Sequence, residues 1–143
     1  MPSRVLAFSS PYVELNIAHR VRFLGYLPEV REVLGRMQLL VMPTMHFESF
    51  GIAAVEAMAM GLPVVVSDIR GCREVVVAGE TGLLTALKDV EALVAAVARL
   101  LGDGDLRMAM GRAGRERVME HYTEARTTQR VADCYRQCLE EGR

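Results

Sequence analysis

Apolar residues concentrate in the middle of the chain, where two short apolar runs flank a segment with a different pattern. Leu39–Pro43 and Pro63–Ser67 have the length and composition of strands that are covered on both faces of a sheet. Between them, Ser49–Met60 is rich in strong helix formers, with Ser49 as a candidate cap and Gly61 as the stop. Two buried strands joined by a helix form a parallel crossover unit. The pattern therefore predicts an α/β fold.

The pattern before this unit is weaker. Arg20–Tyr26 alternates apolar and polar residues, which predicts a strand that ends in a turn. Val30–Gly35 places apolar residues on a common face and predicts a short helix. We also expect a short strand or a frayed leader at Arg4–Ser10 and a short helix or its remnant at Tyr12–His19, although neither segment carries a strong signal.

After the second strand, Asp68 and Gly71 indicate a turn, Glu74–Val77 is a short apolar segment, and Leu83–Thr85 predicts a brief strand. The rest of the chain has a helical pattern, with helices expected from Asp89, as the cap, to Gly102, then at Leu106–His121 and Glu124–Glu141. The stripe of the first helix that should face the core consists of Leu93, Val97, Leu100 and Leu101.

Length and charge narrow the possible functions. With 143 residues, about half of them apolar, the chain fits a single domain, 1–143, with a substantial core. The net charge of −1 argues against nucleic acid as a partner, because phosphate binding calls for a basic excess. No apolar run approaches the ~18 residues of a transmembrane segment, and the start of the sequence does not have the apolar core of a signal peptide.

The three cysteines are too few and too scattered for a disulfide framework, which favours a reducing compartment. Cys134 and Cys138 stand four positions apart on one face of an expected helix, but no other His or Cys pair in the sequence supports a metal site. We therefore expect half-buried thiols and no metal. We also expect a cytoplasmic protein, either free or peripheral to the inner face of a membrane.

The central segment carries two carboxylates, Glu48 and Glu56, in the most apolar part of the chain. A buried carboxylate is unfavourable unless a partner satisfies it. In an open parallel sheet, ligands collect beyond the carboxyl ends of the strands, which is where this segment leaves its strand to enter a helix. The amides near Ser49, Phe50 and Gly51 would point into that crevice, where they and the helix dipole favour a phosphate.

Carboxylates beside a phosphate are repelled by it, so their natural partners are neutral hydroxyls that donate hydrogen bonds. Glu48 precedes the helix and Glu56 lies in its second turn, roughly 12 Å further along at about 1.5 Å per residue. One hydroxyl-bearing group on either side of a diphosphate describes a nucleotide sugar. The alternatives are a solvent-facing helix acid at Glu56 and an acid that complements the helix dipole at Glu48.

The same segment, FESFGIAAVEAMAMGLPVVVSD, resembles the E-x7-E signature of retaining group 1 glycosyltransferases, which have two Rossmann-like domains in the glycosyltransferase B (GT-B) fold. The similarity is to their C-terminal, donor-binding domain. It extends from VRFLGYL through GCREVV and GETGLL to the closing helices, over about Ala18–Leu139. It implies a partial Rossmann-like parallel sheet flanked by helices, with a helical C-terminus, that binds a nucleotide-diphosphate sugar.

The resemblance implies a role for each matching position. Glu48 would be the catalytic residue that faces hydroxyls of the transferred sugar, and Glu56 would accept hydrogen bonds from the ribose. The sugar or diphosphate would be held by Ser49 and by the amides of Phe50, Gly51 and Ile52, and the nucleobase would contact Tyr26 and Leu27. The family transfers the sugar with retention and usually without a metal, so we expect no cofactor besides the donor substrate.

The sequence also departs from the family pattern. The donor domain of the family opens with two further strand-helix units, whose Arg and Lys neutralise the diphosphate, and an acceptor-binding domain precedes it; neither part has a match here. Their absence would leave a gap or an exposed edge in the sheet. We therefore expect a donor domain that is inactive alone. The alternatives are a non-catalytic module completed by a separate chain and a nucleotide-sugar epimerase of the same architecture. Glu74 is equally compatible with a ligand contact and with a helix-start acid.

Overall fold

The computed structural model describes residues 15–141, and the chain divides into two units, residues 1–30 and 31–143. In the first unit, η1 (Ala18–Arg20) is a short 3-10 helix. Residues 21–27 have no regular structure and pair with no strand in the described part of the chain. The strand predicted at Arg20–Tyr26 is therefore wrong, because alternating side chains make a strand only where a neighbour bonds the backbone groups.

The other two predictions for this unit fall at its start. Arg4–Ser10 lies outside the described residues. The described part of Tyr12–His19 contains only the beginning of η1, so no helix of the expected length forms there.

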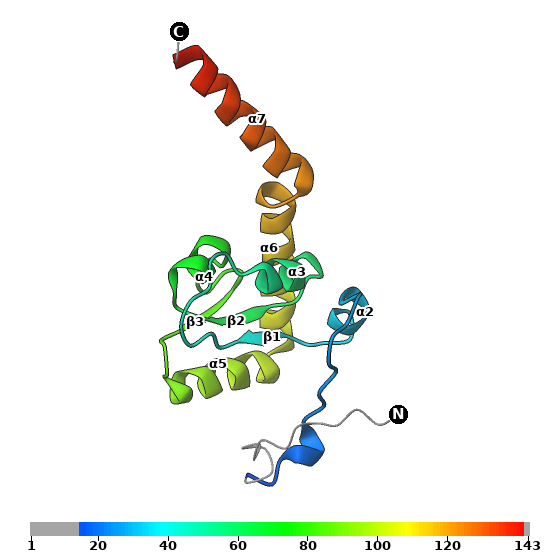
Figure 1. The fold of residues 1–143 in the computed structure, drawn as a ribbon. Coiled ribbons are helices and arrows are strands. Elements are labelled where there is room, and N and C mark those ends of the chain that lie inside the picture. The colour runs from blue at the N-terminus through cyan, green and yellow to red at the C-terminus, as the bar shows by residue number, and fades with distance from the viewer. Residues whose placement is uncertain (1–14, 142–143) are drawn as a thin grey trace. The chain divides into compact units, whose positions relative to one another are not determined.

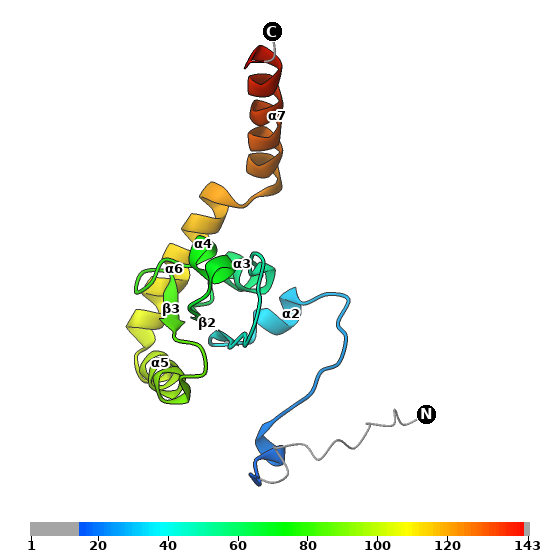
Figure 2. The same cartoon turned by 60° about the vertical axis from the view of Figure 1, so that its left-hand side comes forward.

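The second unit is an α/β structure built on a three-stranded parallel sheet, as predicted (Figures 1 and 2). The strands lie in the order β1 (Leu40–Met42), β2 (Val64–Ser67) and β3 (Gly82–Thr85). The helices are α2 (Arg31–Leu34), α3 (Ile52–Ala59), α4 (Arg70–Val75), α5 (Val90–Gly102), α6 (Gly104–His121) and α7 (Glu124–Glu141). Helix α5 covers one face of the sheet, α3 and α4 lie on the other, and α6 packs against both α3 and α5.

Strand β2 is the centre of the sheet, and its valines Val64, Val65 and Val66 are fully buried. This burial explains why its sequence is apolar without alternation. Strand β1 pairs only with β2 within residues 15–141, and its Val41 is 37% exposed. The described sheet therefore has the exposed edge that the sequence led us to expect.

A core cluster of Val65, Leu100 and Met110 joins the sheet to α5 and α6. The partly buried residues that pack against it are Leu39, Leu83, Leu93, Ala96, Val97 and Leu106. Three members of the predicted α5 stripe thus face the core. Leu101 does not, and is 51% exposed, because one residue beyond Leu100 the helix has turned by about 100°.

Two glycines let α6 lie close to α3. A Cβ on Gly111 would stand 2.0 Å from the carbonyl oxygen of Gly61, and a Cβ on Gly114 would stand 3.3 Å from Met58. The sequence marks both glycines only as positions of weak helix propensity. The structure shows that they allow a backbone approach that fixes the end of α3.

The C-terminal helices follow their local signals. Asp89 and Asp103 cap α5 and α6, and each carboxylate accepts an amide hydrogen bond, of 2.8 and 2.9 Å respectively. Helix α7 has the predicted bounds, but Cys134 and Cys138 on it are exposed, so the prediction of half-buried thiols is wrong. None of the helices within residues 15–141 combines the length and the apolarity of a membrane span.

Candidate functional site

An open pocket of about 530 Å³ lies beyond the carboxyl ends of β1 and β2. One wall is the loop that connects β1 to α3, and the other is the start and inner face of α4. The lining residues are His46, Phe47, Glu48, Ser49, Ile69, Arg70, Gly71 and Glu74. The pocket therefore occupies the position where open parallel sheets bind their ligands.

Glu48 fixes the start of α3. Its Oε1 accepts hydrogen bonds from the amides of Gly51, at 2.9 Å, and of Phe50, at 3.3 Å. Gly51 is the N-cap residue and has a φ of 85°, a left-handed conformation that suits glycine. The predicted cap, Ser49, is therefore wrong: the N-cap residue stands two positions later, and no side chain caps the helix there. A charged carboxylate complements the helix N-terminus better than a hydroxyl does.

These hydrogen bonds change which amides a ligand could use. The amides of Phe50 and Gly51, expected to hold a diphosphate, already bond Glu48. The next amides, of Ile52 and Ala53, have no acceptor within residues 15–141. Because both bonds end on Oε1, the second oxygen of Glu48 is available to accept from a hydroxyl.

Helix α4 lies directly against the loop that carries Glu48. A Cβ on Gly71 would stand 2.2 Å from the carbonyl oxygen of Glu48 and 2.8 Å from the carbonyl carbon of Ser49. Only glycine allows this approach. The sequence indicates a turn at Gly71 and an apolar segment after it, whereas the structure forms the helix Arg70–Val75, which was missed.

The pocket holds two carboxylates and one guanidinium among its lining side chains. Glu74 pairs with Arg70 at 3.3 Å, and the two side chains are 49% and 91% exposed. Such an exposed pair contributes little to stability and exchanges easily for another partner. Arg70 is a functional candidate that sequence reasoning missed, although its position four residues before Glu74 on a helix could have indicated the pair.

Cys72 is buried on α4, behind the pocket wall. Burial raises the pKa of its thiol, and the nearby negative charge of Glu48 raises it further. The thiol therefore stays protonated near neutral pH and is a poor nucleophile.

The structure does not bring every predicted residue to the pocket. Glu56 lies on α3, is exposed, and makes no hydrogen bond or ion pair through its side chain within residues 15–141. Tyr26 and Leu27 belong to the N-terminal unit, and Tyr26 is 91% exposed. Their proposed contacts with the ribose and the nucleobase stay predictions.

The fold and the pocket define an α/β domain with a parallel sheet and a candidate site beyond the carboxyl ends of its strands. Comparison with known proteins gives the family. The family model of glycosyl transferases group 1 matches residues 9–117. The chain belongs to the group 1 glycosyltransferases.

Several relatives are similar over most of the chain. It is 40% identical over 110 residues to a glycogen synthase of Mycobacterium tuberculosis, covering 73% of this chain and 26% of that protein. It is 33% identical over 131 residues to the lipopolysaccharide core biosynthesis mannosyltransferase LpcC of Rhizobium leguminosarum, covering 92% of this chain and 37% of that protein. The chain thus spans well under half the length of these curated relatives.

Solved structures agree on the fold. Sucrose-phosphate synthase of Thermosynechococcus elongatus matches with a TM-score of 0.84 and 32% identity, over 92% of this chain and 33% of that chain. Anabaena HepE in complex with UDP matches with a TM-score of 0.85 over 88% of this chain and 35% of that chain. At 23% identity, the second likeness shows the fold alone.

Proposed function

We propose that the chain is the donor-binding part of a group 1 glycosyltransferase that transfers a sugar, with retention, from a nucleotide-diphosphate sugar to an acceptor. The observation that carries the proposal is the carboxylate of Glu48, fixed at the start of α3 inside the pocket beyond the strand ends. The E-x7-E spacing to Glu56 and the family membership support it. Since the chain covers 26% and 37% of two relatives, the activity of the whole protein is part of the proposal.

Glu48 binds hydroxyls of the transferred sugar in this proposal. Its Oε1 is held by two backbone amides, so the carboxylate has a fixed direction before the ligand arrives. The other oxygen then accepts from a sugar hydroxyl. A hydrogen bond to a charged acceptor contributes about 1.5–3 kcal/mol, which makes the sugar, and not only the nucleotide, a source of affinity.

The diphosphate lies at the start of α3 and uses the amides of Ile52 and Ala53, together with the helix dipole. Arg70 leaves Glu74 and pairs with a phosphate oxygen, because their exposed pair is weak. Glu56 accepts hydrogen bonds from the ribose, further along α3. The proposal places the nucleobase against Tyr26 and Leu27.

The test is a binding titration followed by amide chemical shifts, with UDP, GDP and ADP and their glucose conjugates. HepE has been solved with UDP and with UDP-glucose, which makes these the first probes. We expect shifts at Phe50, Gly51 and Ile52, and tighter binding of one sugar conjugate than of its diphosphate. The absence of any shift at millimolar concentration of all six compounds would overturn the proposal.

Two substitutions test the proposed roles of Glu48 and Glu56. Glu48→Gln keeps an oxygen that can accept the two amide hydrogen bonds but removes the charge, so we expect it to weaken the preference for the sugar conjugate about tenfold. Glu56→Gln should weaken the conjugate and the free diphosphate equally, because both contain the ribose. Glu91→Gln, in the exposed first turn of α5, is the control and should leave both affinities unchanged.

Turnover by the chain alone is not expected, since no position matches the Arg and Lys that neutralise the diphosphate in the family.

A second candidate function is a non-catalytic module that a separately encoded chain completes. The observation in its favour is the exposed edge of β1, which pairs only with β2 among the described residues. A monodisperse monomer that unfolds cooperatively would contradict this candidate. The cytoplasmic location stays a prediction.

A further inference from the structure

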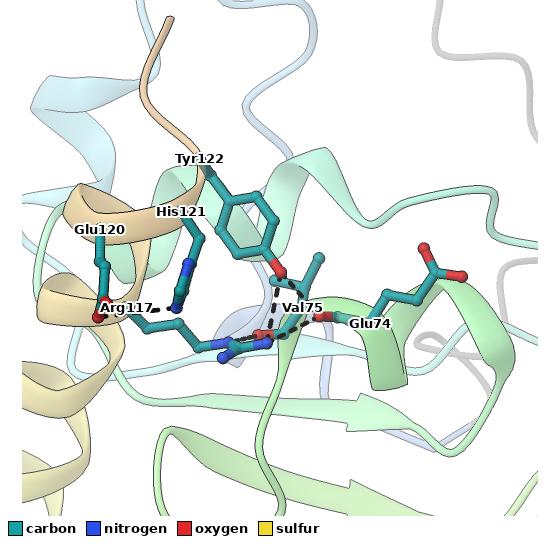
Figure 3. Close-up of polar contacts among 6 residues, drawn as sticks. All are labelled: Glu74, Val75, Arg117, Glu120, His121 and Tyr122. Carbon is teal, nitrogen blue, oxygen red and sulfur yellow. Dashed lines mark hydrogen bonds and ion pairs between the residues drawn. The ribbon is translucent and has the colours of Figure 1, made fainter. Parts of the chain in front are cut away.

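The last turns of α6 reach back to the end of α4 (Figure 3). Arg117 donates from Nε to the carbonyl oxygen of Val75 at 2.7 Å, and from Nη2 to that of Glu74 at 3.0 Å. The hydroxyl of Tyr122 donates to the same Glu74 carbonyl at 2.7 Å. These carbonyls are at the carboxyl end of α4, where the last carbonyl oxygens of a helix have no N–H donors within the helix.

These contacts matter because α4 is short. Six residues form less than two turns, and such a helix does not persist without tertiary contacts. Its N-terminal end packs against the Glu48 loop through the close approach of Gly71, and no side chain caps this end. Arg117 and Tyr122 hold the other end.

Tyr122 also contacts the opposite wall of the pocket. Its ring stands edge-to-face with that of Phe50, with the ring centroids 5.5 Å apart and the planes at 74°. The amide of Phe50 in turn bonds the carboxylate of Glu48. Tyr122 therefore contacts both Phe50, whose amide bonds Glu48, and the backbone of Glu74, although it does not line the pocket itself.

Figure 3 shows that Arg117 and Tyr122 bond the backbone of Glu74 and not its side chain. The carboxylate of Glu74 points away from them. The side chain that lines the pocket is thus left free for Arg70 or for a ligand.

We infer that Arg117 and Tyr122 are positioning residues, which set the separation between α4 and the Glu48 loop and so determine the affinity of the pocket for the sugar of its ligand. The effect on affinity rests on the proposed function. The contacts of Arg117 and Tyr122 with α4 and Phe50 do not depend on the proposed function, and they can be tested in the free protein.

The sharpest variant is Tyr122→Phe, which keeps the ring against Phe50 and deletes only the hydroxyl. The hydroxyl donates to the Glu74 carbonyl at 2.7 Å and accepts from Nη2 of Arg117 at 3.4 Å. Loss of these two bonds should raise the Kd of the glucose conjugate that binds the wild type most tightly by about three- to tenfold. Arg117→Gln removes the two-carbonyl contact and should raise it further, and Arg117→Lys, which keeps one charged donor, should recover part of the loss. The controls are Tyr135→Phe, on a tyrosine 69% exposed on α7, and Arg112→Gln, on the exposed side of α6.

Two readouts separate positioning from general stability. Amide shifts should change at Phe50, at Gly51 and along α4, and hydrogen exchange should accelerate there but not in β2. Affinity should fall at a temperature where thermal melting shows every variant to be fully folded. Wild-type affinity in both Tyr122→Phe and Arg117→Gln would overturn the inference, as would a Kd that changes only with the unfolded fraction.

A failure of the proposed function gives a different result. If the wild type binds none of UDP-, GDP- and ADP-glucose, the proposal for the ligand is wrong. Hydrogen exchange in the free protein then decides the positioning role. Exchange that is faster in α4 and at Phe50 in the variants supports this role, and unchanged exchange overturns it.

Discussion

Gly71→Ala is the sharpest test of how the pocket is built. The added methyl group would stand 2.2 Å from the carbonyl oxygen of Glu48, whereas ordinary contacts begin near 3.4 Å. Either α4 or the Glu48 loop must therefore move by about 1.2 Å, the difference between these two distances. Overpacking of this kind costs about 1–3 kcal/mol, and the better helix propensity of Ala recovers no more than about 1 kcal/mol. We expect a net loss of about 1–2 kcal/mol in the free energy of unfolding.

Urea denaturation measures this loss, and the same samples can be titrated with the nucleotide sugar. For the proposed ligand, the displaced wall should also weaken binding, because the two walls that carry Glu48 and Glu74 would no longer have the same separation. Gly102→Ala is the matched control: nothing lies within 4 Å of the place that its Cβ would take, so added helix propensity should leave the protein as stable or slightly more stable. A Gly71→Ala protein with wild-type stability and affinity would refute the close approach of α4 to the loop.

Three further predictions concern the second unit. Gly111→Ala should lower the free energy of unfolding by about 1–3 kcal/mol in urea denaturation, since its methyl group would collide with the Gly61 carbonyl; an unchanged midpoint would contradict the packing of α6 on α3. Cys134 and Cys138 should react rapidly with a thiol reagent at pH 8 while Cys72 reacts only on unfolding. Because the pKa of Cys72 is raised on folding, its contribution to stability is complete below the ordinary thiol value of 9.0 and is lost as pH rises through the raised value. Cys72→Ala should remove that part of the alkaline decline, and a decline identical to that of the wild type would exclude Cys72 as its source.

Local signals were sufficient for most elements of the second unit. Strands β1 and β2, helix α3 between them, and the capped helices α5 and α6 follow from composition, period and cap residues close in sequence. The predicted burial on both faces is correct for β2 and wrong for β1, whose Val41 is 37% exposed. The sequence also predicted where the pocket lies, because the carboxyl end of a parallel strand and the start of the next helix are adjacent along the chain.

The errors arise where distant residues decide the structure. The alternation in Arg20–Tyr26 is a genuine strand pattern, yet no partner strand exists for it in the described part of the chain. Helix α4 was missed because six residues carry little helical signal, and its end is held by Arg117 and Tyr122, much later in the sequence. The N-cap residue is the left-handed Gly51 and not Ser49, and the carboxylate of Glu48 accepts from the amides just before the helix, which residue preferences alone do not show.

The two walls of the pocket are therefore fixed in different ways. Glu48 is oriented locally, by amides two and three residues ahead, whereas α4 depends on donors 42 and 48 positions later. All of these contacts lie within the second unit. Neutralising a diphosphate requires positive charge, and Arg70 is the only guanidinium among the lining side chains. In the proposed function, binding of the sugar and departure of the nucleotide therefore depend on different groups, and we expect substitutions in this unit to change the first even where the second does not occur.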